Sequence, residues 1–181
     1  RALLTRHPLP APVVWNSGGY DRVETLAALE GKIQIYLPDY KYTDPDTARR
    51  YAGAADYPET ARAAIREMVR QTGPYQLDEN GILTRGVILR HLLLPGGLNQ
   101  AKEVMDWVAE TFPPHTILFS LMSQYTPWGK ATDYPPLDRR LRKSEIRAAE
   151  AYFTNLGLDG FTQGVEAAQA DYIPTFDLTG V

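Results

Sequence analysis

The chain alternates short apolar segments of strand character with amphipathic segments of helix character, and this alternation restricts the fold most. Apolar segments occupy residues 12–16, 32–38, 86–94 and 116–122. Helical periodicity follows at residues 21–31, 56–73, 99–112 and 144–157. Such alternation is typical of α/β proteins with parallel strands and right-handed crossovers. Because a closed eight-unit barrel needs about 250 residues, the sequence predicts a partial (β/α) barrel with outer helices.

Local signals place the boundaries of these elements. Asp21, Asn99 and Ser144 are the expected starts of three helices. The residues from 43 to 56 are expected to form a polar loop, and those after 157 a tail. The apolar stripe of the helix at 56–73 is interpreted as core packing rather than a cofactor site.

Composition excludes several classes of protein. The 181 residues carry a formal charge of −3, so no general binding of nucleic acid is indicated. The basic clusters at 49–50 and 138–143 are interpreted as solvated surface. No apolar run of about 18 residues occurs, so no membrane span is expected. The chain has no cysteine and three histidines, so disulfides and thiolate ligands are excluded and a histidine metal site is not expected.

Polar side chains continue the second predicted strand where its apolar pattern ends. Ile33, Ile35 and Leu37 share one face, and Asp39 and Lys41 continue the same parity. A carboxylate and an ammonium so placed can hold different parts of a polar ligand. They can equally form a simple ion pair at a strand end, and spacing alone leaves both interpretations open.

Other candidates lie near the ends of the other strands. Arg90 and His91 are adjacent, so only one of them can face a central cavity, and an arginine in an apolar strand needs a partner or a ligand. The turn Asn16-Ser17-Gly18-Gly19 can bring backbone amides close to a ligand. Gln124 and Tyr125 follow the fourth strand. The aromatic loop 125–134 is either a lid or a packed surface loop.

Five motifs, taken in order, carry a family resemblance. They are WNSGGY (15–20), YLPDYKY (36–42), EMVRQTG (67–73), RGVILRHLLLPGG (85–97) and LMSQYTP (121–127). Together they resemble the C-terminal part of radical S-adenosylmethionine proteins of the pyruvate formate-lyase activating enzyme-like family. The resemblance implies a split (β/α)6 barrel. In that family a CxxxCxxC loop binds a [4Fe–4S] cluster, which cleaves S-adenosylmethionine to a 5′-deoxyadenosyl radical for hydrogen abstraction.

The resemblance also implies cofactor-binding residues. Asp39 and Lys41 match the family's Asp-x-Lys at the ribose and carboxylate of S-adenosylmethionine. Asn16 and Gly18, with Ser17 between them, match a turn along the same cofactor, and Arg90 matches an arginine of a later strand. Met122 matches an adenine-packing position. Tyr125 stands where the family places a cofactor-contacting histidine, so its role departs from the pattern.

The departures from the family are informative. No CxxxCxxC segment and no Gly-Gly-Glu motif is present, and the chain starts at Arg1. We therefore expect residues 1–181 to be a single C-terminal fragment that starts just before the third barrel strand. It should hold part of the cofactor pocket, with no catalytic residue and no metal ligand of its own, and be inactive alone. Its first strand should be an unpaired edge that favours dimerisation.

The resemblance implies partners and a location for the parent protein. A glycyl radical enzyme or another protein would be the substrate, flavodoxin or ferredoxin the electron donor, and the cytoplasm the location. Two alternatives belong to other classes. One is a non-catalytic α/β binding or scaffold module, which the missing cysteines favour. The other is a cofactor-free hydrolase that uses Asp39 or Asp177 as a general base and needs a second carboxylate or nucleophile nearby.

Overall fold

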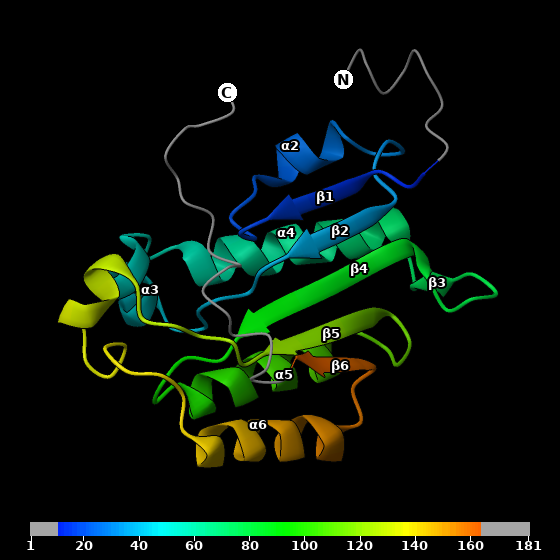
Figure 1. Cartoon of the computed structure of the whole chain (residues 1–181). Helices are drawn as coiled ribbons and strands as arrows, with labels where there is room; N and C mark the ends of the chain where they lie inside the picture. The colour runs from blue at the N-terminus through cyan, green and yellow to red at the C-terminus, as the bar shows by residue number, and fades with distance from the viewer. Residues whose placement is uncertain (1–10, 164–181) are drawn as a thin grey trace, which may run out of the picture.

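A computed structural model describes residues 11–163 and shows a curved, mostly parallel sheet (Figure 1). The parallel strands lie in the order β1-β2-β4-β5-β6. Their bounds are Val14–Ser17, Ile35–Pro38, Leu83–Leu92, Ile117–Met122 and Gly160–Gln163. The short strand β3 (Gln76–Leu77) pairs antiparallel with β4. The predicted partial α/β barrel is confirmed.

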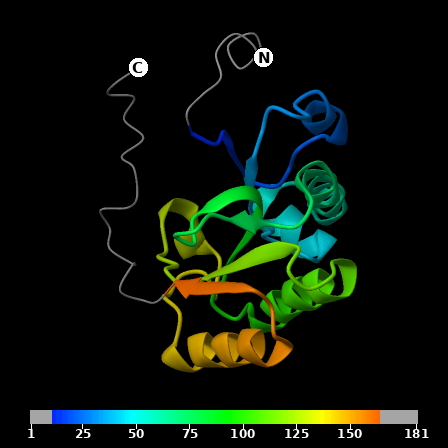
Figure 2. The same ribbon diagram turned by 90° about the vertical axis from the view of Figure 1, so that its right-hand side faces the viewer.

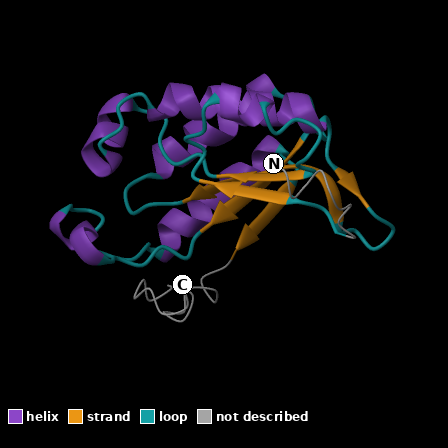
Figure 3. Cartoon of the chain, turned by 90° about the horizontal axis from the view of Figure 1, so that it is seen from above, coloured by secondary structure: helices purple, strands orange, loops and turns teal. Residues whose placement is uncertain are grey.

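The helices of residues 11–163 follow one side of this sheet, and none of them covers its other face (Figures 2 and 3). The α-helices are α2 (Val23–Ala27), α3 (Pro45–Ala52), α4 (Tyr57–Thr72), α5 (Leu98–Thr111) and α6 (Lys143–Leu156). A 3₁₀ segment, η1 (Gly129–Asp133), lies between β5 and α6. Among residues 11–163, no helix is long and apolar enough to cross a membrane.

The core lies between the helices and the sheet. The predicted stripe of α4 is buried at Ala61, Ala64, Ile65 and Met68. On β4 the odd positions Val87, Leu89 and His91 are buried, whereas Ile88, Arg90 and Leu92 are only partly buried. Because successive side chains of a strand alternate between faces, Arg90 and Leu92 share the face opposite the buried set.

The structure adds elements that the sequence pattern did not predict. Helix α3 occupies the expected loop at 43–56, and β6 occupies part of the expected tail. Helix α3 buries only Ala48, and β6 buries none of its four residues fully, so neither has a strong apolar pattern. Gly160 must lie directly against the Phe119 backbone for β6 to pair, since a Cβ there would overlap Phe119 O.

The predicted helix caps need correction. Arg22, Gly97 and Arg142, rather than Asp21, Asn99 and Ser144, stand at the N-caps of α2, α5 and α6. The Asp21 carboxylate instead accepts a hydrogen bond from Ser17, and Glu145 caps α6 by accepting the Arg142 N–H.

The expected edge strand is present within the described part of the chain. β1 stands at the end of the strand order and pairs only with β2, and Val14 on it is 47% exposed. Dimerisation through this edge stays a prediction. The alternative general base Asp177 lies outside the described residues.

Candidate functional site

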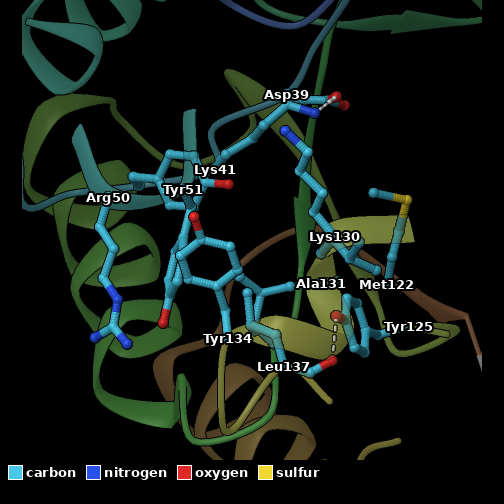
Figure 4. A pocket seen from close by; sticks show the side chains of 13 residues that line it. Asp39, Lys41, Arg50, Tyr51, Met122, Tyr125, Lys130, Ala131, Tyr134 and Leu137 are labelled. Atoms are coloured by element: carbon cyan, nitrogen blue, oxygen red, sulfur yellow. Dashed lines mark hydrogen bonds and ion pairs between the residues drawn. The ribbon is translucent and has the colours of Figure 1, made fainter. Parts of the chain in front are cut away.

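A cavity of about 410 Å³ opens at the carboxyl ends of the parallel strands (Figure 4). Its walls come from the segments after β2, β4 and β5, together with α3 and η1. The lining residues are Asp39, Lys41, Tyr42, Arg50, Tyr51, Leu92, Leu94, Met122, Tyr125, Lys130, Ala131, Tyr134 and Leu137. This is the edge where α/β proteins usually bind ligands, and the volume suits a small molecule.

An ion-pair network joins three strand ends beside the cavity. The Asp39 carboxylate lies 3.0 Å from Lys41 Nζ and 2.7 Å from Arg90 Nη2. Arg90 Nη2 also donates to Asn16 Oδ1 at 2.6 Å. Parity correctly placed Asp39 and Lys41 together. Asp39 and Lys41 form an ion pair, and both also line the cavity. The ion pair at the strand end is therefore compatible with contact to a ligand.

Arg90 is incompletely satisfied by these contacts. Its Nε is buried and has no hydrogen-bond partner among the described residues. Asp39 Oδ1 is buried too, and its contact with Arg90 lacks hydrogen-bond geometry despite the short distance. The pair is therefore an electrostatic contact, and the buried Nε of Arg90 is an unsatisfied donor.

The turn after β1 packs against the segment that carries Asp39. Gly19 has φ +78°, and a Cβ there would overlap Asp39 O, so only glycine allows this approach. Ser17 Oγ accepts the Gly19 N–H at 3.2 Å and donates to Asp21 at 2.5 Å, which fixes the turn. Gly18 faces Lys41, since a Cβ there would lie 3.9 Å from Lys41 Cε.

Tyr57, in the first turn of α4, connects these segments, and sequence reasoning missed it. Its hydroxyl accepts the Lys41 N–H at 2.9 Å. It can donate to Gly18 O at 2.9 Å or to Asp39 O at 3.0 Å. Burial raises the pKa of the Tyr57 phenol, so it stays protonated and acts as a fixed bridge.

His91 is a structural residue. It is 1% exposed, and its Nδ1 lies 2.7 Å from Tyr40 O. Burial lowers the pKa of the imidazole, which is therefore neutral at pH 7 and donates from Nδ1. Of the two adjacent candidates, Arg90 belongs to the ion-pair network and His91 to the core.

Tyrosines form the outer wall of the cavity. The Tyr51 ring lies 6.1 Å from those of Tyr42 and Tyr134, which links α3 to the segment after η1. Tyr125 donates to Leu137 O at 2.7 Å. Burial raises the pKa of the Tyr42 and Tyr125 phenols, so both rings are neutral. The loop 125–134 thus packs against α3, and movement as a lid stays a prediction.

The predicted site residues divide into two groups. Asp39, Lys41, Met122 and Tyr125 line the cavity. Arg90 and Asn16 contact Asp39 or its partner, and Ser17 and Gly18 build the adjacent turn. Sequence reasoning missed Arg50, Tyr51 and Lys130, because α3 and η1 lie outside the strand-helix repeat. Tyr42 could have been found, since it ends the same motif as Asp39 and Lys41.

The cavity walls exclude some chemistry. Asp39 is the one carboxylate among the described residues that line this cavity, so the lining offers no carboxylate pair for a hydrolase. No group of three His, Cys, Asp or Glu residues within 11–163 could hold a metal ion. With no cysteine in the chain, its residues do not fit an iron–sulfur cluster. The lining instead combines aromatic rings and Met122 with charged side chains.

Fold and cavity together define the class: an α/β protein on a partial parallel barrel, with a polar and aromatic cavity at the carboxyl edge. No family model matches the sequence. An uncharacterized protein of Methanocaldococcus jannaschii is 30% identical over 149 residues, which cover 82% of this chain and 39% of that protein. The chain thus spans well under half the length of that relative.

A solved structure shares the fold. It is a domain of pyruvate-formate lyase-activating enzyme from Bacteroides vulgatus, with a TM-score of 0.58 and 15% sequence identity. The match covers 82% of this chain and 79% of that one. At this identity the likeness shows the architecture.

Proposed function

We propose that this chain forms the C-terminal, S-adenosylmethionine-binding part of a radical enzyme similar to pyruvate formate-lyase activating enzyme. The observation that carries the proposal is the ion-pair network of Asn16, Asp39, Lys41 and Arg90 beside a cavity. Three motifs far apart in the sequence meet there, as the family resemblance requires. The shared architecture with a domain of such an enzyme supports it further.

The residues can divide the cofactor between them by chemistry. The Asp39 carboxylate can accept hydrogen bonds from ribose hydroxyls, and the Lys41 ammonium can pair with the cofactor's carboxylate. Arg90 holds Asp39 in place through their ion pair. Met122 and the cavity tyrosines offer apolar contact to adenine. When bound beside an iron–sulfur cluster, S-adenosylmethionine would supply a radical for hydrogen abstraction.

The rest of the proposal follows from the resemblance. The cluster would be held outside these 181 residues, so this part alone would be inactive. A glycyl radical enzyme or another protein would receive the radical chemistry, and flavodoxin or ferredoxin would deliver the electron, in the cytoplasm.

The test uses the protein expressed from its complete reading frame under anaerobic conditions. Iron content, the visible cluster absorbance and 5′-deoxyadenosine formed after reduction would be measured. We expect a cluster, formation of 5′-deoxyadenosine, and loss of most of that activity in Asp39→Asn. The control Asp46→Asn removes a carboxylate that pairs only with Arg49 on the surface and should be fully active.

The second candidate is a non-catalytic binding or scaffold module, which the absence of cysteine favours. A complete reading frame without a cluster or upstream cysteines would establish this alternative. A loaded cluster that forms no 5′-deoxyadenosine would instead reject the radical function while retaining the iron–sulfur protein.

A further inference from the structure

Lys130 of η1 contributes a second ammonium to the cavity. Its side chain extends from η1 toward the end of the cavity that holds Asp39 and Lys41 (Figure 4). The ion pairs of the described residues join Asp39 to Lys41 and Arg90 and give Lys130 no carboxylate partner. Arg50 also lines the cavity, but its guanidinium stacks on the Tyr51 ring at 5.4 Å and points away from Asp39 (Figure 4).

The charges at this end of the cavity do not balance. Among the described residues of this network and cavity lining, one carboxylate, Asp39, stands against the cations of Lys41, Arg90 and Lys130. The chain as a whole is negative, at −3, so the positive excess is local. Partly apolar walls strengthen the attraction between such cations and an anion.

We propose that the cavity binds a small ligand whose carboxylate or phosphate group lies between the ammonium groups of Lys41 and Lys130. The volume of about 410 Å³ limits the ligand to a small molecule. This inference adds an anion site to the proposed function. It rests on the proposed function only where it assigns the anion to the cofactor. The anionic group belongs either to the cofactor's amino-acid tail or to a separate substrate.

The experiment measures binding by calorimetry to the protein expressed from its complete reading frame. S-Adenosylhomocysteine carries a carboxylate, 5′-methylthioadenosine lacks the amino-acid tail, and inorganic phosphate carries charge alone. Lys130→Gln should weaken binding of the anionic probe about 10-fold. Lys130→Arg should retain most of the affinity, because it keeps the charge.

Arg50→Gln is the matched control. It also removes one positive charge from the lining of the same cavity, from a side chain that points away from Asp39 (Figure 4). We expect it to change affinity by about twofold or less, as for a screened distant charge. Melting temperatures of all variants check that they fold, and Lys130 is exposed, so none is expected to unfold.

The outcomes separate the two sources of the anion. If Lys130→Gln weakens the binding of S-adenosylhomocysteine but not that of methylthioadenosine, the cofactor's carboxylate is the anion. If the substitution weakens only the binding of phosphate, a substrate supplies the anion. Phosphate binding that depends on Lys130, without binding of either nucleoside, would support the inference and reject the proposed function. Three results would overturn the inference. They are equal losses of affinity in Lys130→Gln and Arg50→Gln, no loss of affinity in Lys130→Gln, and no binding of any probe.

Discussion

At the scale of single residues, Gly19 makes the closest backbone approach in the site, against the carbonyl oxygen of Asp39. Gly31 offers a matched comparison, because its φ of +75° resembles the +78° of Gly19 but nothing lies near it. Gly31→Ala should lower the free energy of unfolding by about 1–2 kcal/mol, which is the cost of the left-handed backbone conformation for alanine. Gly19→Ala adds a steric clash and should cost about 3–5 kcal/mol. Urea unfolding measures both, and equal costs would contradict the close packing.

Tyr57 tests whether the site depends on one buried hydroxyl. Tyr57→Phe keeps the ring but leaves the Lys41 N–H and the Gly18 carbonyl without this partner, so it should cost about 1–3 kcal/mol. The control Tyr20→Phe removes a hydroxyl that donates to Asp56 on the surface and should cost about 0.5 kcal/mol. Denaturant unfolding compares them. Equal costs would show that the Tyr57 bridge contributes little.

Residues of the candidate site were predictable where one strand pattern contained them. Asp39 and Lys41 share the period of their strand, and that period places them together. Tyr57 lies 16 residues beyond Lys41 at the start of a helix, and only the packing of α4 brings it back to the turn after β1. No local pattern in the sequence carries this contact.

At the scale of elements, the strand-helix repeat was predictable because each unit has a strong apolar period. Helix α3 was missed because its residues are mainly polar and bury only Ala48. A local signal was nevertheless present, since Asp44 followed by Pro45 is a common start of a helix. Strand β6 has no such signal, because its pairing depends on Gly160 lying against the Phe119 backbone.

Helix α3 carries Tyr51 of the cavity wall, so its start can be tested. The Asp44 carboxylate accepts the Thr47 N–H at 2.7 Å. Hydrogen bonding to the Thr47 side chain and then to its backbone lowers the pKa of Asp44. Asp44→Ala should cost about 1 kcal/mol. Asp46→Ala removes a surface pair with Arg49 and an acidic side chain of the first turn but no cap, and should cost about 0.5 kcal/mol. Thermal unfolding measures both, and a larger cost for Asp46→Ala would reject the cap.

At the scale of the whole molecule, the cavity requires segments that no single stretch of sequence contains. Its lining comes from residues 39–51, 92–94 and 122–137, which the parallel sheet brings to one edge. The fold therefore predicted where a site should lie. The second ammonium, Lys130, was not predictable, because only the fold brings η1 to the same cavity as the segments after β2 and β4.

Glu145 joins distant segments near this edge and should govern stability in acid. Its carboxylate accepts hydrogen bonds from Arg139, the Arg142 N–H and the Gly96 N–H, which lower its pKa from 4.5 to about 2. This stabilisation is complete above pH 4.5 and is lost as the pH falls toward 2. Buried His91 has a lowered pKa, so its contribution declines already as the pH falls below 6.5.

We therefore expect the free energy of unfolding to fall in two stages on acidification, the first from His91 and the second from Glu145. Glu145→Gln should reduce it by about 2 kcal/mol at pH 7, because hydrogen bonds to a charged acceptor are lost. The difference between the variant and the original protein should shrink below pH 4.5 and be mostly lost near pH 2, where about half of the Glu145 carboxyl groups are protonated. Urea unfolding from pH 7 to 2 measures it. A difference independent of pH would mean that Glu145 stabilises the folded protein through packing rather than through its charge.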